Sequence, residues 1–121
     1  MPNVQNGTGR VLAQSVATTA ATVIYGPVTG LNQQVEIRAL VINNESASAT
    51  TVSYGVGLAG STAGAAGTSQ GKTVPLGAAG TSTAIIDATE LEGIILGVGD
   101  YVWVQAGANS AVAYTLNGIV Y

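Results

Sequence analysis

The sequence predicts an all-β fold, an antiparallel β-sandwich of seven to nine short strands with a jelly-roll or immunoglobulin-like topology. The composition is rich in Gly, Ala, Thr, Ser and Val and poor in long helix-forming side chains. Short segments alternate apolar and polar residues, as strands with one buried face do. Turn signals recur roughly every ten residues, which is typical of sandwiches and small barrels. The 121 residues fit one domain of the usual size.

Two segments carry the strand prediction most strongly. In residues 50–58, bulky apolar residues alternate with small or hydroxyl-bearing ones, which predicts a half-buried strand. Residues 35–43 also alternate, with Val35, Ile37, Ala39 and Val41 on one face and Glu36, Arg38, Leu40 and Ile42 on the other. Because this second face turns from charged to apolar, we expect Leu40 and Ile42 to be covered, either by another part of the domain or by a neighbouring subunit.

The remaining segments complete a single domain over residues 11–121. Residues 1–10 are polar and glycine-containing, and we expect a flexible arm in which Val4 is the one candidate for burial. The Gly-Ala-Ser-Thr stretch 59–71 predicts a long exposed loop. Pro75 restricts the strand around it to a sheet edge. The other strands are expected at 11–17, 22–25, 72–76, 83–88, 94–96, 101–106 and 112–121.

Charge and residue types exclude several function classes. Charged residues make up 7% of the chain, against roughly 25% in an average soluble protein. The formal charge of −3 provides no basic surface for nucleic acid. The absence of histidine and cysteine excludes imidazole and thiol catalysis, disulfides and thiolate metal sites. Because these residue types are absent, we expect a non-enzymatic protein without a cofactor. No segment is apolar enough to span a membrane and no signal peptide is recognised, so we expect the protein to stay in the cytosol.

Two short motifs resemble nucleotide-binding signatures without their structural context. The stretch from Gly55 to Gly60 matches the Gly-x-Gly-x-x-Gly dinucleotide pattern, but the residues that follow are poor helix formers. The stretch from Gly67 to Thr73 resembles a P-loop, but its first glycine position is Ala66 and Pro75 interrupts any following helix. Small residues leading into a loop explain both motifs.

Acidic and aromatic residues give two weaker site hypotheses. The carboxylates of Asp87, Glu90, Glu92 and Asp100 lie close in sequence but lack the spacing of a calcium loop or a glycosidase pair. We interpret them as solvated turn residues, with an incidental cation site as the alternative. Tyr101 and Trp103 share one face of a strand and are expected in the core or at an interface. The alternative is a sugar-stacking platform in a carbohydrate-binding sandwich.

Three stretches resemble the small β-sandwich structural proteins of tailed-bacteriophage virions, which include capsid decoration, cement and tail-associated modules. They are the segment from Ala21 to Val28, similar to an Ala-Thr-x-x-Tyr-x-Val opening, the segment from Val35 to Asn44, similar to a central strand that ends in asparagine, and the segment from Leu96 to Val104, similar to a Leu-x-x-Gly-Asp-x-Val-x-Val turn and strand. The resemblance implies a homo-oligomer, commonly a trimer, that docks on a capsid or tail lattice and has no catalytic residues.

These observations together predict a virion protein that decorates or cements a phage capsid and is assembled in the host cytoplasm. A tail, neck or fibre module and a carbohydrate-binding sandwich are the alternatives. The expected partners are further copies of the chain and the major capsid protein or tail proteins, with no nucleic acid and no membrane. The candidate interface residues are Val4, Arg10, Leu40, Ile42, Tyr101 and Trp103.

Overall fold

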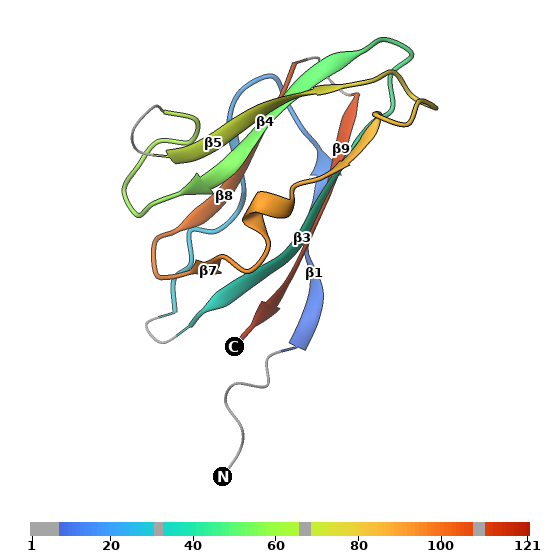
Figure 1. Ribbon diagram of the computed structural model, residues 1–121. Coiled ribbons are helices and arrows are strands. Elements are labelled where there is room, and N and C mark those ends of the chain that lie inside the picture. The colour runs from blue at the N-terminus through green and yellow to red at the C-terminus, as the bar shows by residue number, and fades with distance from the viewer. Residues whose placement is uncertain (1–7, 31–32, 66–68, 108–110) are drawn as a thin grey trace.

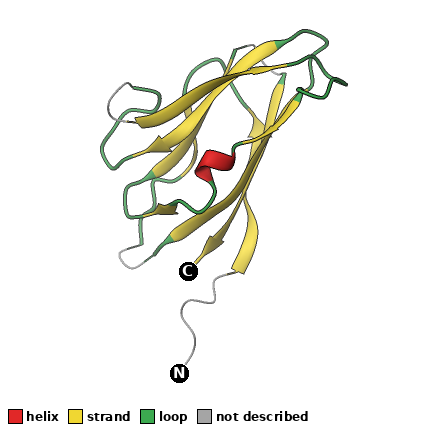
Figure 2. Cartoon of the chain, in the orientation of Figure 1, coloured by secondary structure: helices red, strands yellow, loops and turns green. Residues whose placement is uncertain are grey.

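Two antiparallel β-sheets packed face to face make up the fold, so the predicted β-sandwich is confirmed (Figure 1, Figure 2). The computed structural model describes residues 8–30, 33–65, 69–107 and 111–121. Within them nine strands and one short 3-10 turn are formed. None of the helical segments described is long and apolar enough to cross a membrane.

Each sheet mixes strands from both halves of the chain. Sheet A has the order β1 (Thr8–Val16), β9 (Val112–Val120), β3 (Val35–Asn44) and β6 (Ile85–Asp87), and β7 (Ile95–Leu96) also pairs with β3. Sheet B has the order β2 (Thr22–Tyr25), β8 (Tyr101–Ala106), β4 (Thr50–Gly57) and β5 (Ser69–Leu76). The 3-10 turn η1 (Thr89–Leu91) lies between β6 and β7. This strand order is that of a jelly roll, one of the two topologies expected.

Aliphatic side chains fill the space between the sheets. Sheet A contributes alternate residues of β3 and β9, and sheet B contributes alternate residues of β4 and β8. Leu91 in η1 closes the core on the side of β6 and β7. The fully buried side chains include Val35, Ile37, Leu40, Ile42, Val52, Leu76, Leu96, Val102, Val104, Val112 and Leu116. The core is therefore built mainly from Val, Ile and Leu, with Tyr54 and Tyr114 among its larger side chains.

A β-bulge in β3 corrects the predicted faces of this strand. The pairing with β9 changes register between Ile37 and Ala39, so Arg38 is an extra residue in the strand. One extra residue moves all later side chains to the opposite face. Leu40 and Ile42 consequently enter the core with no exposed surface. Another part of the domain covers them, and a neighbouring subunit cannot reach them in this fold.

The ends of two predicted segments also differ from the structure. β1 begins at Thr8, so the last three residues of the expected arm already belong to a strand. Val4 and the rest of that arm lie outside the described residues. β5 begins at Ser69 and takes the last three residues of the expected loop. Pro75 lies in this edge strand, as predicted.

Candidate assembly surface

Tyr101 and Trp103 lie on the outer face of sheet B, where glycines leave room for their rings. Gly57 pairs with Tyr101 and Gly55 pairs with Trp103. A Cβ atom on Gly57 would overlap the ring of Tyr101, and one on Gly71 would lie 2.5 Å from Cζ2 of Trp103. Gly57 at the end of β4 and Gly71 in β5 therefore leave room for the aromatic rings of β8.

The segment that follows β4 closes over these rings. The hydroxyl of Tyr101 donates a hydrogen bond to the backbone carbonyl of Ser61 at 3.0 Å. The hydroxyl oxygens of the Tyr101 and Ser61 side chains lie 2.9 Å apart. Tyr101 and Trp103 retain 3% and 4% of their surface. Among the described residues Nε1 of Trp103 has no acceptor, so packing alone holds the indole. Neither ring is exposed, which makes the sugar-stacking platform wrong and leaves no surface on them for a partner.

Asp100 has a structural role in the turn before β8. Its carboxylate accepts hydrogen bonds from the backbone N–H of Ala59 at 3.2 Å and of Gly97 at 3.0 Å. It thereby joins the connection after β4 to the turn before β8. Among the described residues no three acidic side chains come together at a place that could hold a metal ion.

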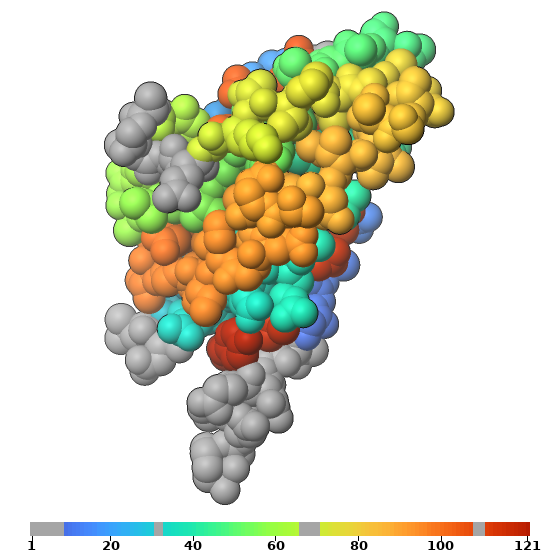
Figure 3. All heavy atoms as spheres, in the orientation of Figure 1, coloured from blue at the N-terminus to red at the C-terminus, as the bar shows by residue number. Residues whose placement is uncertain are grey.

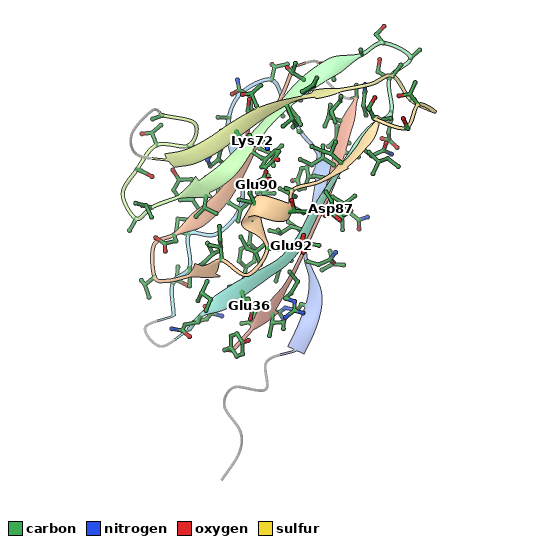
Figure 4. The ribbon with its side chains drawn as sticks, in the orientation of Figure 1. Glu36, Lys72, Asp87, Glu90 and Glu92 are labelled. Carbon is green, nitrogen blue, oxygen red and sulfur yellow. The ribbon has the colours of Figure 1, made fainter. Side chains whose placement is uncertain are left out.

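Glu90 joins η1 to sheet B. The hydroxyl of Tyr54 donates a hydrogen bond to the Glu90 carboxylate, and Nζ of Lys72 lies 3.8 Å from the other oxygen (Figure 4). The hydrogen bond from Tyr54 lowers the pKa of the Glu90 carboxyl. The pKa of the Tyr54 hydroxyl is raised, mainly by burial and then by its bond to Glu90. These groups line a cavity of about 140 Å³ with Leu91 and Ile94. Since each polar group already has a partner, the cluster serves to hold the two sheets together.

Among the edge strands in the described part of the chain, β1 is the longest and has neither lysine nor proline. β5 has Lys72 and Pro75 at its edge, residues that discourage pairing. β2 has four residues with a register shift, and β6 and β7 have three and two residues separated by η1. β1 has nine residues without lysine or proline, and its register shifts once, between Val11 and Ala13. Its outer backbone groups are therefore available to another strand.

The outer face of sheet A carries several exposed apolar side chains. Charged residues on it include Glu36, Arg38 and Asp87, and Glu36 pairs with Arg38 at 3.3 Å. Figure 3 shows that the segment of η1 and β7, drawn in orange, lies at the surface. Half of the eight exposed large hydrophobic residues in the described ranges belong to this face, namely Val11, Val16, Ile85 and Ile95.

Of the predicted interface residues that the structure describes, only Arg10 lies at the surface. It is exposed on β1, whereas the four others are buried in the core or beneath the connection after β4. The β1 edge as a whole escaped prediction. The available signal was the absence of lysine and proline from residues 11–17, compared with Lys72 and Pro75 in the strand predicted at 72–76.

Comparison with protein-family models and with curated protein sequences finds no match. The fold is similar to a solved structure of the disulfide-linked pili that form Bacillus endospore appendages. The TM-score is 0.50 and the sequence identity is 15%, over 94% of this chain and 86% of that chain. At this identity the likeness establishes the fold.

The comparison contradicts the expected function as a phage protein that decorates the capsid or belongs to the tail, because the similar structure belongs to a bacterial appendage. The stretches that carried the phage resemblance are β2 with its glycine-proline end, β3, and the turn into β8. They supply core side chains and turn geometry to the sandwich. Such features are shared by sandwiches with different roles, so they could not identify a lattice.

Proposed function

We propose that the chain is a structural subunit that assembles with further copies of itself into an appendage of the pilus type. The long outer edge of β1, which has neither lysine nor proline, is the observation that carries this proposal. A strand of nine residues without lysine or proline presents a row of backbone donors and acceptors to which another strand can add. A monomeric protein usually blocks such an edge.

The low charge of the chain supports self-association. With nine charged side chains among 121 residues, two copies meet little electrostatic repulsion. Val11 and Val16 of β1 are 54% and 44% exposed, so a second strand at this edge would remove apolar surface from water. Interfaces between subunits are depleted in charge in the same way.

The proposed assembly is non-covalent and non-catalytic. The similar pili are disulfide-linked, whereas this chain has no cysteine, so backbone pairing and side-chain packing must hold its copies together. The chain also lacks histidine, and the carboxylates of Glu90 and Asp100 are engaged in structural hydrogen bonds. A trimer on a capsid is not part of this proposal.

Replacement of Val16 by lysine tests the proposal. Val16 is exposed at the β1 edge, so a lysine there should leave the fold intact while adding a charge that opposes strand addition. We expect wild-type protein to form oligomers or fibres in light scattering and electron microscopy, and Val16→Lys to remain monomeric. The melting temperatures of the two should agree within a few degrees, because surface substitutions usually change stability by less than about 0.5 kcal/mol.

Leu58→Lys is the matched control. Leu58 is 55% exposed and follows β4, away from the β1 edge, so this variant should assemble like wild type. A wild-type chain that stays monomeric at high concentration would overturn the proposal. Equal assembly of Val16→Lys and Leu58→Lys would show that β1 is not the contact.

A further inference from the structure

Sheet A ends in two different edges, β1 on one side and β6, η1 and β7 on the other. We infer that these edges bind each other between copies, so that β1 of one subunit docks on the β6–η1 edge of the next and Arg10 meets Glu92. The inference rests on the proposed self-assembly and adds its direction, its register and the ion pair that selects it.

Strand direction allows the sheet to continue from one copy to the next. β1 is antiparallel to β9, β9 to β3, and β3 to β6, so β6 runs opposite to β1. A second copy placed beside the first in the same orientation therefore presents an antiparallel strand to β1. Such a contact uses two different surfaces, so every copy keeps one edge free for the next copy. When the rotation between copies does not close a ring, the array is a helical fibre.

Residues that pair with one another from β1 through β9 and β3 to β6 form rows across sheet A. In two of these rows the residues at the two ends match chemically. The row that starts at Val16 ends at Ile85, both exposed and apolar. The row that starts at Gln14 ends at the carboxylate of Asp87. The two rows consist of Val16, Ala113, Asn43 and Ile85, and of Gln14, Thr115, Val41 and Asp87.

The row of Arg10 ends beside Glu92. Arg10 pairs with Gly118, which pairs with Ile37. The backbone N–H of Gly93 then donates to the carbonyl of Ile37 at 2.8 Å. Glu92 directly precedes Gly93, so a copy that continues the sheet brings its Glu92 to the level of Arg10.

The charges that would meet are unpaired within the described part of the chain. The ion pairs found there join Arg38 to Glu36 and Lys72 to Glu90. Arg10 takes part in neither and is exposed at the β1 edge. Figure 4 shows Asp87 and Glu92 on the side of β6 and η1, and both are exposed. One edge therefore offers a cation and the opposite edge offers carboxylates that can pair with it.

Another kind of partner fits this surface less well. Nucleic acid and anionic membranes would be repelled by the formal charge of −3. A symmetric contact between two β1 strands would bring two copies of Arg10 toward the same edge and leave Asp87 and Glu92 without a cation. A second copy docked head to tail satisfies both edges at once.

Charge reversal and its rescue test the inference. At low salt, Arg10→Glu and Glu92→Arg should each assemble at least about tenfold less than wild type, since each places like charges at the contact. Mixed in equal amounts, the two variants should assemble again. The Glu92→Arg variant keeps its native Arg10 and the Arg10→Glu variant keeps its native Glu92, so these two side chains can pair, and the two introduced charges are also opposite in sign. Light scattering and electron microscopy of the two single samples and the mixture provide the measurement.

Glu45→Arg is the control, since it reverses an exposed carboxylate in the connection after β3 with the same change in net charge as Glu92→Arg. It should assemble like wild type. If wild type assembles but Arg10→Glu does so equally well, or if the mixture shows no rescue, the head-to-tail pair is wrong while self-assembly stands. If wild type does not assemble, both the inference and the proposed function fail.

Discussion

The outer faces of the two sheets differ in how they are covered. On sheet B, the chain covers its own aromatic rings, with Tyr101 and Trp103 lying across glycines beneath the connection after β4. On sheet A, Val11, Val16, Ile85 and Ile95 remain exposed, and no strand among the described residues pairs with the outer edge of β1. The difference is that the chain itself covers the large rings of sheet B, whereas in the proposed assembly another copy covers the edge of sheet A.

Replacing Gly57 by alanine should give the largest change in stability, because the new Cβ would overlap the ring of Tyr101. We expect the free energy of unfolding to fall by about 1–3 kcal/mol, the usual cost of overpacking. Urea unfolding monitored by near-ultraviolet circular dichroism would show both the lower stability and the displaced ring.

Gly9→Ala on sheet A is the matched control for this substitution. No atom lies within 4 Å of a Cβ placed there, so its unfolding free energy should stay within about 0.5 kcal/mol of wild type. Equal effects at the two positions would mean that the packed and bare faces do not differ as described.

A smaller effect is expected from Glu90→Gln at the side where η1 meets sheet B. The bond from Tyr54 lowers the pKa of Glu90 in the folded state below its ordinary value of 4.5. The ionised group therefore stabilises the fold above pH 4.5, and this contribution is lost as the pH falls through the lowered pKa. Because Glu90 is exposed, the contribution should stay below about 1 kcal/mol.

Thermal melts of wild type and Glu90→Gln over pH 2–7 measure this contribution. The difference in melting temperature should be largest near neutral pH and should shrink on acidification below 4.5, the ordinary pKa of the group. A difference that grows with acid would show that the Tyr54–Glu90 bond does not stabilise the fold in its ionised form.

Local alternation was enough to predict the sandwich and most of its strands. Val52, Tyr54 and Val56 lie on the buried face of β4, as the period of two requires. Pro75 indicated an edge strand because proline has no backbone N–H to donate to a neighbouring strand. These signals depend on neighbours along the chain, so a sequence carries them directly.

Features that depend on contacts across strands could not be predicted in the same way. The bulge at Arg38 is fixed by pairing with Gly118 and Asn117 of β9, which are distant in sequence, and it sends Leu40 and Ile42 into the core. The burial of Trp103 likewise requires Gly71 from another strand. The candidate interface was therefore assigned mainly to residues that the fold buries, while the β1 edge went unnoticed.

Hydrogen exchange of β1 in the assembled and monomeric protein tests the central claim most directly. If another copy adds a strand at this edge, amides within residues 8–16 that face outward in the monomer should exchange at least about tenfold more slowly in the assembly. The segment 58–65, which covers sheet B, should exchange at the same rate in both states. An assembly in which β1 gains no protection, or in which residues 58–65 gain it instead, would contradict the account.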